Sequence, residues 1–354
     1  MFSYQKLFRR NQLRILAQTR KIASIKGQRV YLVGGTVRDL LLGRPEVDLD
    51  LAVEGDGLLF ARELARHIGG RLVFHDRFLT ATVYWGGERV DVATTRQEYY
   101  PRPGALPEVE PANLEADLAR RDFSINAMAL PVVARDLGSV IDPFGGREDL
   151  TGQKLRVLHR DSFRDDPTRI LRGVRFTTRL KFAWEEETCA LARQALAGGY
   201  LELLEPKRLW QELILLLKER RPVVAWESLI DLGWQGIPGA GVPDIGAGRR
   251  AERLLWQWKW RGQSSIDAGL VYFLIATAKL KPATLENILD SLNFGRKKRS
   301  KIYAARDLLP ELAPCLTRRD LLECLPGGTR MAPEVLIFIL AMAGWSQLPA
   351  RVLP

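Results

Sequence analysis

Cysteine and histidine are both scarce in this sequence, with three of each among 354 residues. The cysteines, Cys189, Cys315 and Cys324, lack the spacing of metal ligands, so we expect them to be reduced residues of a cytoplasmic protein. So few histidines argue against a histidine-rich metal site. No apolar run is long enough to cross a membrane, and no membrane partner is expected.

Acidic residues are missing from the N-terminal stretch. No Asp or Glu occurs before Asp39, whereas Lys and Arg are frequent there. A basic, acid-free start resembles a transit peptide. However, the first strand is expected near Val30, which leaves little to remove. We therefore predict a basic helix that leads into the first domain.

The whole chain is basic. It has 53 Lys and Arg against 42 Asp and Glu, a formal net charge of +11. Such a surplus favours a polyanionic partner, with nucleic acid as the first candidate and an anionic membrane surface as the second. The length predicts two or more domains, and the hydrophobic fraction of 46% is typical of a globular protein. The sequence predicts no oligomeric state.

A glycine turn follows the first predicted strand, 31–33. Two glycines allow a tight turn that feeds a helix running to about Leu42, where Thr36 and Asp39 have the spacing of a capping box. Free N–H groups at such a helix start attract anions, and an arginine in its first turn adds a planar fork for phosphate. The residues of this predicted phosphate site are Gly34, Gly35 and Arg38.

Two aspartates follow in a segment that alternates with period two. Asp48 and Asp50 share one face of a predicted strand, and the apolar residues share the other. Neighbouring carboxylates repel each other unless a cation lies between them, and Mg²⁺ commonly takes one or two carboxylates together with substrate phosphates. The alternative is a solvated acidic strand edge, which a D-x-D motif alone would favour.

A third carboxylate could join this pair. Short β-like runs are predicted at 71–75, 81–85 and 89–93, and Asp91 lies between two valines in the last of them. If that strand neighbours the D-x-D strand, Asp91 becomes the third acidic residue of a metal cluster. The alternative is a single exposed aspartate.

Two further segments suit nucleotide recognition. Arg121, Asp122 and Asn126 offer donors and acceptors for a triphosphate and a ribose, although a surface salt-bridge cluster is the alternative. In the segment 165–176, Asp166 is predicted to cap a helix and to share a face with Arg169. A carboxylate beside a guanidinium matches the base edges of cytosine and adenine and leaves uracil and guanine unpaired, a discrimination of roughly 10⁴. The alternative is a capped helix with a solvated basic face.

Together these motifs resemble the class II tRNA nucleotidyltransferase and bacterial poly(A) polymerase family. The likeness covers about 30–213 and includes G-G-x-V-R-D, D-x-D, R-R-D-F-S-I-N-A-M-A and an E-D-x-x-R-like motif whose first position is Asp165. It implies an α+β fold, in which a polymerase-β-like head with a mixed sheet precedes an all-helical neck, body and tail. It also implies catalytic residues Asp48, Asp50 and Asp91, of which Asp48 and Asp50 bind two Mg²⁺ ions, and nucleotide-binding residues Gly34, Gly35, Arg38, Arg121, Asp122, Asn126, Asp166, Arg169, Arg172 and Arg175.

The resemblance implies an enzyme that adds CCA, or part of it, to the 3′ end of tRNA from CTP and ATP. Residues 96–113 are predicted to be a loop, either functional or disordered. Family members that add the final A keep a flexible loop here. Addition of A alone to tRNA ending in CC and poly(A) synthesis remain open, as do a non-catalytic RNA-binding protein and an antibiotic-modifying nucleotidyltransferase.

The C-terminal part is expected to be helical. A stretch rich in Gly and Pro, 236–248, marks a boundary, so we predict a head at 1–150, a neck at 151–235 and a body with tail at 249–354. Further helices are expected at 249–261, 267–278, 282–292, 297–309 and 333–345. Aromatic and basic residues there could contact RNA, although tryptophans are more often core and charge runs more often solvated. They are Trp256, Trp258 and Trp260, and the basic run Arg296, Lys297, Lys298 and Arg299.

Overall fold

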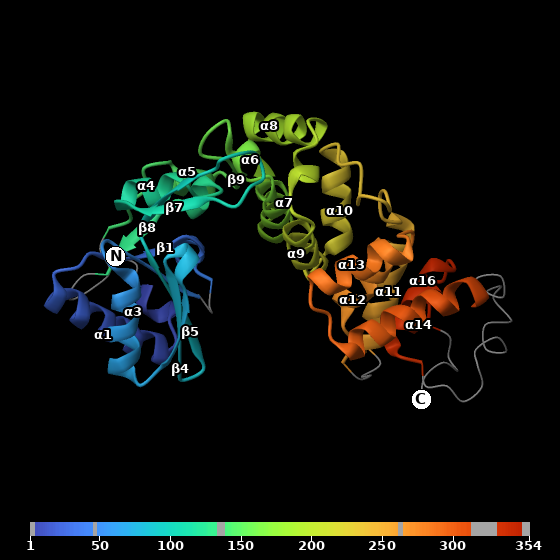
Figure 1. Cartoon of the computed structure of the whole chain (residues 1–354), viewed down its shortest axis with the longest axis horizontal. Helices are drawn as coiled ribbons and strands as arrows, with labels where there is room; N and C mark the ends of the chain where they lie inside the picture. The colour runs from blue at the N-terminus through green and yellow to red at the C-terminus, as the bar shows by residue number, and fades with distance from the viewer. Residues whose placement is uncertain (1–3, 45–47, 133–138, 261–264, 313–330, 349–354) are drawn as a thin grey trace. The chain divides into compact units, whose positions relative to one another are not determined.

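A computed structural model of the chain describes residues 4–44, 48–132, 139–260, 265–312 and 331–348 (Figure 1). Cys315 and Cys324 lie outside these residues. Within the described residues, no helix combines the length and the apolar character needed to cross a membrane.

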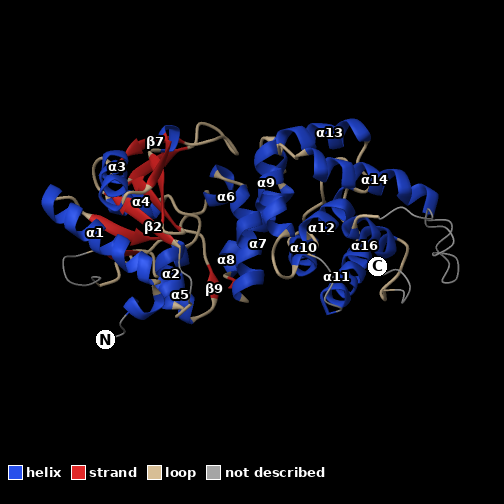
Figure 2. Ribbon diagram, turned by 90° about the horizontal axis from the view of Figure 1, so that it is seen from below, coloured by secondary structure: helices blue, strands red, loops and turns tan. Residues whose placement is uncertain are grey.

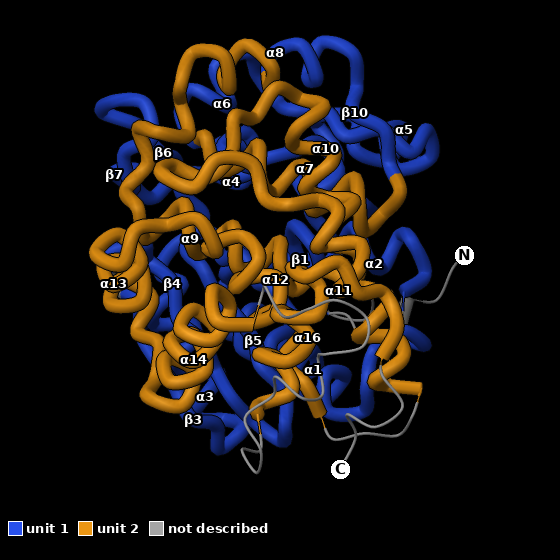
Figure 3. The backbone as a smooth tube through the Cα atoms, turned by 90° about the vertical axis from the view of Figure 1, so that its right-hand side faces the viewer, with its two compact units in different colours: residues 1–166, 182–191 blue, residues 167–181, 192–354 orange. Residues whose placement is uncertain are grey.

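The chain forms two compact units. The first comprises residues 1–166 and 182–191, and the second comprises residues 167–181 and 192–354 (Figure 3). All the strands that the structure describes belong to the first unit, and the second is helical (Figure 2). The expected α+β fold, a mixed sheet with helices followed by helices, is confirmed. The division into head, neck and body at the predicted boundaries stays a prediction.

The first unit is built on a six-stranded mixed sheet with the strand order β3-β4-β5-β2-β1-β8. Strands β2 and β5 are parallel, and the other neighbours are antiparallel. The three β-like runs predicted after the D-x-D motif are β3, β4 and β5. The strands are β1 (Val30–Val33), β2 (Leu49–Val53), β3 (Arg71–His75), β4 (Thr80–Trp85), β5 (Glu88–Thr94) and β8 (Ala129–Pro131).

Helices cover both faces of this sheet. Helix α3 (Gly57–Ile68) packs on β2, β4 and β5, and α1 (Arg10–Lys26), the predicted basic lead-in helix, packs on α3 and β1. On the opposite face of the sheet, Ala52 forms a buried cluster with residues of β1 and of α4 (Leu114–Ala119). Because side chains alternate along a strand, Asp50 projects to the same face as Ala52. The D-x-D carboxylate is therefore on the face that α4 covers.

The predicted loop at 96–113 is wrong in part, because its two ends pair as an antiparallel hairpin. Strand β6 (Arg96–Tyr99) pairs with β7 (Glu108–Pro111), and only the intervening residues form a loop. Polar and charged residues hide the alternation that normally indicates a strand. The remaining elements of the first unit are η1 (Tyr4–Leu7), α2 (Gly35–Leu41), η2 (Asp76–Phe78), η3 (Ser124–Asn126), α5 (Gly146–Thr151), β9 (Lys154–Leu155), α6 (Ser162–Asp165) and β10 (Ala183–Trp184).

Aromatic side chains build the core of the second unit. Phe273 meets Trp210 and Phe294, and Tyr272 meets Trp226 edge to face. Each helix predicted beyond residue 248 corresponds to a described helix. The helices are α7 (Thr168–Leu180), η4 (Tyr200–Leu203), α9 (Pro206–Leu217), α10 (Pro222–Asp231), α11 (Ile245–Trp260), α12 (Ala268–Thr277), α13 (Pro282–Ser291), α14 (Arg296–Leu312) and α16 (Pro333–Met342), while α8 (Glu186–Ala197) begins in the first unit and ends in the second.

Candidate active site

Asp50 and Asp91 lie directly opposite each other on the parallel strands β2 and β5. Asp91 accepts a hydrogen bond from Thr82 Oγ1 at 2.7 Å and pairs with Arg89 at 2.7 Å. Burial and the negative charges of Asp91 and Asp48 raise the pKa of Asp50 to about 6, although Arg121 and Arg89 oppose the shift. The expected neighbourhood of the D-x-D strand and Asp91 is therefore confirmed.

Thr36 connects the glycine turn to the D-x-D strand. Its hydroxyl donates to the carbonyl oxygen of Asp48 at 2.8 Å and accepts from the backbone N–H of Asp50 at 3.0 Å. The prediction that Thr36 caps α2 is wrong, because Gly34 occupies the N-cap position and no side chain caps this helix. The hydroxyl instead bonds to the backbone on both sides of Leu49, and these bonds fix the distance between the glycine turn and the D-x-D strand.

The donor set suits a hard cation such as magnesium. Asp50 is a partly buried carboxylate whose pKa is raised first by burial and then by the neighbouring charge of Asp91, and a bound cation would relieve both. Mg²⁺ prefers oxygen ligands and needs only one or two carboxylates when substrate phosphates supply the rest. Among the described residues, no group of three or more His, Cys, Asp or Glu side chains is placed to hold a metal ion. The role of Asp91 as a third ligand stays a prediction.

Arg121 lies against the glycine turn. Gly34 has a φ of 64°, and a Cβ atom built on it would come within 2.7 Å of the Arg121 Nη1 atom. Arg121 Nη2 donates to Asp117 at 2.7 Å, whereas its buried Nε has no hydrogen-bond partner among the described residues. Since Arg121 also lowers the pKa of Asp50, one guanidinium serves both the turn and the carboxylate pair.

Arg38, Asn126 and Asp122 form a buried network. Arg38 Nη1 donates to Asn126 Oδ1 at 2.6 Å, and the Asn126 amide donates to Asp122 at 2.9 Å. Arg38 is only 5% exposed and also pairs with Asp39. The sequence predicts that Arg38 presents its guanidinium to phosphate. The structure instead places it where it orients Asn126, and its direct contact with a nucleotide stays a prediction.

A buried ionic cluster fixes the position of Arg121. Asp117 also accepts from Arg120 at 2.7 Å, and Arg120 donates to Glu98 on β6 at 2.7 Å. Burial raises the pKa of Asp117, but Arg121 and Arg120 outweigh it and lower that pKa below its usual value. The sequence analysis offered a surface salt-bridge cluster as the alternative at this position. A salt-bridge cluster is present, yet it is buried and it includes the hairpin.

The predicted cap of the base-selecting segment is displaced by one residue. Asp166 closes α6 as its C-cap, and Pro167 rather than Asp166 precedes the first residue of α7. The fixed φ of proline suits this helix start without a side-chain cap. Within the second unit, Arg169 is buried, and Arg172 and Arg175 reach Glu212 at 3.9 and 3.1 Å. Their roles in nucleotide binding stay predictions.

The predicted basic run at the start of α14 is partly neutralised within its own unit. Arg299 pairs with Asp290 at 2.6 Å and with Glu286 at 3.6 Å. Lys298 pairs with Asp267 at 2.8 Å. A role for Arg296, Lys297, Lys298 and Arg299 in RNA binding stays a prediction, and these pairs weaken it.

Gly34→Ala tests the close approach of Arg121. The methyl group would require a positive φ at a non-glycine residue, which costs about 1–2 kcal/mol, and would displace the guanidinium. We expect a loss of stability beyond the cost of the positive φ alone, measured by thermal unfolding. Gly27→Ala is the matched control, since Gly27 has a φ of 61° and open space around it. Equal behaviour of the two variants would contradict the contact.

Residues 30–156 match the family described as Poly A polymerase head domain. The chain is 37% identical over 332 residues to the A-adding tRNA nucleotidyltransferase of Geobacter sulfurreducens, covering 88% of this chain and 37% of the relative. It is 44% identical to the enzyme of that name from Halalkalibacterium halodurans, covering 65% and 55%. It is 41% identical to the CC-adding tRNA nucleotidyltransferase of Deinococcus radiodurans, covering 60% and 54%. The chain thus spans little more than half of these relatives at most.

Solved structures match over more of their length. A CCA-adding enzyme without ligands superposes with a TM-score of 0.78 at 34% identity, covering 95% of this chain and 81% of that one. The Thermotoga maritima CCA-adding enzyme complexed with tRNA superposes with a TM-score of 0.75 at 31% identity, covering 96% and 80%. With the head motifs in place on the sheet, the chain belongs to the class II tRNA nucleotidyltransferase and bacterial poly(A) polymerase family.

Proposed function

We propose that this chain is a template-independent nucleotidyltransferase that adds nucleotides from ATP and CTP to the 3′ end of tRNA. The observation that carries the proposal is the pairing of Asp50 with Asp91 on one sheet face, beside a glycine turn that Arg121 touches. Acidic oxygens next to an anion-binding turn suit the transfer of a nucleotide from a triphosphate. Membership of the family supports the choice of tRNA.

Each part of the site has a distinct task in this proposal. Asp48 and Asp50, with Asp91 beside them, would hold Mg²⁺, and a bound ion would supply charge stabilisation for the RNA 3′-hydroxyl and the departing pyrophosphate. Arg121 and the N–H groups of the glycine turn bind the triphosphate. Thr36 keeps that turn at a fixed distance from the carboxylates. Positioning and charge stabilisation account for most of the catalysis in such reactions.

Asp166 and Arg169 select the base in this proposal. A carboxylate accepts from the exocyclic amine of cytosine or adenine, and a guanidinium donates to the adjacent ring acceptor. Uracil and guanine present the opposite pattern and would leave polar groups unpaired, which costs roughly 10⁴ in discrimination. The asparagine and aspartate of the buried network, Asn126 and Asp122, orient the ribose.

Addition of A alone to tRNA that ends in CC is the second candidate. Two relatives that match over 235 residues or more are A-adding enzymes. The structural neighbours above are named as CCA-adding enzymes, and another relative is a CC-adding enzyme. The candidates differ in the products that they predict, so a single assay separates them.

The assay incubates the chain with tRNA that lacks CCA, ends in C, or ends in CC, with each NTP alone and with all NTPs together. Sequencing of the RNA ends then shows which nucleotides were added. Full CCA addition predicts completed ends on all three substrates, whereas A addition predicts one A on CC ends only. Long A tails on unrelated RNA would indicate a poly(A) polymerase. No addition to any RNA by the folded chain would overturn the proposal.

A further inference from the structure

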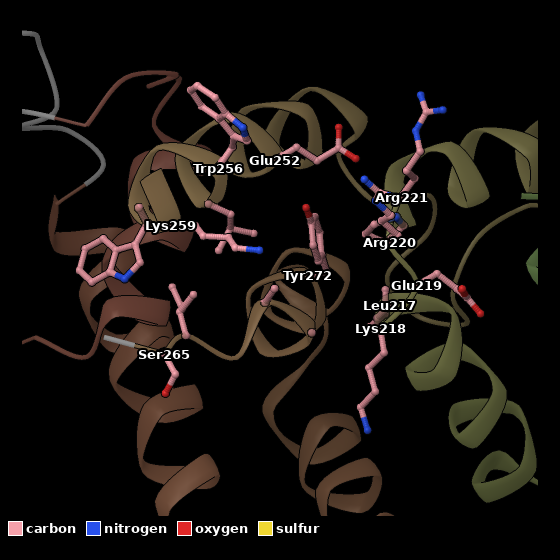
Figure 4. A pocket seen from close by; sticks show the side chains of 16 residues that line it. Leu217, Lys218, Glu219, Arg220, Arg221, Glu252, Trp256, Lys259, Ser265 and Tyr272 are labelled. Carbon is pink, nitrogen blue, oxygen red and sulfur yellow. The ribbon is translucent and has the colours of Figure 1, made fainter. Parts of the chain in front are cut away.

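The second unit contains a hollow of about 770 Å³ between helix α11, the start of α12 and the segment that joins α9 to α10. Trp256 and Lys259 line it from α11 and Tyr272 lines it from α12, with the Lys259 side chain directed towards Tyr272 (Figure 4). Lys218 and Arg221 line it from the joining segment. This volume is within the range of small-ligand pockets and could admit one nucleotide of a chain.

The cations of this hollow form no ion pair or hydrogen bond through their side chains within the part of the chain that the structure describes. Among the described residues, no hydrogen bond or ion pair engages the side chains of Lys218, Arg220, Arg221 or Lys259. The two acids of the hollow already have arginine partners outside it, because Glu219 pairs with Arg175 at 3.1 Å and Glu252 with Arg249 at 3.6 Å. Glu252 also acts on Arg221, and Asp267 acts on Lys218. Four cations still face two acids, so the hollow carries a surplus of positive charge.

Exposed aromatic surface adjoins these cations. Trp256 and Trp260 are 65% and 78% exposed and stack on each other with ring centroids 5.7 Å apart at 16°. Their neighbour Trp258 is buried, as a core tryptophan should be. Burying even one such ring in a core is strongly favourable, so two in solvent on one helix face need a further explanation.

We propose that this hollow and the Trp256–Trp260 pair form a binding site for an RNA strand, in which an unpaired base stacks on the tryptophans and phosphates contact the cations. Aromatic rings accept every base, and lysine and arginine follow the backbone, which is the combination found in single-strand binding sites. The inference rests on the proposed function only in naming RNA as the polyanion. It replaces the basic run 296–299, whose charges are partly neutralised, as the main contact of the second unit.

Direct binding of a labelled tRNA transcript ending in CC, measured without NTP at several salt concentrations, tests this site. Trp256→Ala and Trp260→Ala should each weaken binding about ten-fold or more. Leu215→Ala is the matched control, because Leu215 is an exposed apolar residue of the same unit outside the hollow. Lys259→Glu should weaken binding and reduce the salt slope by about one or more. Lys279→Glu, the same charge change at an exposed residue of this unit outside the hollow, should leave both near the wild-type values.

Several results would overturn the proposal. The first is that the variants at Trp256, Trp260 and Lys259 bind tRNA as tightly as their control variants do. The second is free ATP that quenches tryptophan fluorescence as strongly as RNA does, since this would indicate a site for small nucleotides. The third is self-association of the wild type that Trp256→Ala abolishes without RNA, since this would indicate a protein interface.

A chain that binds RNA through the hollow but adds no nucleotide would overturn the proposed function alone. A chain that extends tRNA with every hollow variant unimpaired would overturn the inference alone.

Discussion

Asp50→Asn is expected to reduce nucleotide transfer roughly a thousand-fold or more while it makes the metal-free chain more stable. The loss of activity follows because an amide cannot replace a carboxylate in holding a divalent cation, which contributes several kcal/mol to such reactions. RNA binding, which depends on other residues, should stay unchanged.

The gain in stability follows from the pKa of Asp50. Its folded-state value of about 6 lies above the usual 3.8, so the native chain binds more protons than the unfolded chain between these pH values. The free energy of unfolding therefore falls as pH rises from about 4 to about 6, by up to about 3 kcal/mol from this residue. Denaturant unfolding in EDTA should show this slope in the wild type and its absence in Asp50→Asn. An equal slope in both proteins would contradict the assignment.

Asp117→Asn is expected to have the largest effect on stability. Asp117 is almost fully buried and pairs with Arg120 and Arg121, so its neutralisation leaves Arg121 without its carboxylate and Arg120 with Glu98 alone. Breaking a buried ion pair by removing one partner typically costs about 3–5 kcal/mol. The KM for ATP should also rise about ten-fold or more, because Arg121 loses the bond that holds it beside Gly34.

Glu115→Gln serves as the control for this variant, since Glu115 is an exposed acid on the same helix. Thermal unfolding and steady-state kinetics on both variants separate the two effects. An Asp117→Asn protein with the stability and the KM of Glu115→Gln would show that the buried cluster has no part in positioning Arg121.

The head of this protein could be predicted from its sequence because its signals are local and periodic. Alternation around Asp50 and around Asp91 predicts two half-buried strands, but spacing alone left open whether they are neighbours, and only the family resemblance favoured the placement that the structure shows. The prediction of the glycine turn depended only on Gly34 and the helix after it, and Gly34 has the positive φ that such a turn requires.

The wrong predictions at Thr36 and Arg38 share one cause, which is that a sequence does not show hydrogen-bond partners that lie elsewhere in the chain. The spacing of Thr36 predicts a helix cap, yet its hydroxyl bonds to the backbone around β2 instead. The sequence predicts that the Arg38 guanidinium is available to phosphate, yet Asn126, 88 residues away, accepts its hydrogen bond. In the same way, nothing in the sequence distinguishes the buried Trp258 from the exposed Trp256 and Trp260.

Transfer from ATP labelled at the α-phosphate, compared with ATP labelled at the γ-phosphate, tests the central claim most directly. The claim is that the carboxylates at Asp48, Asp50 and Asp91 support nucleotide transfer onto an RNA 3′ end. It predicts that, with Mg²⁺, α-label enters tRNA ending in CC and resists dialysis, that γ-label does not, and that EDTA prevents incorporation. Folded protein that binds this tRNA but transfers only γ-label, or no label at all, would contradict it.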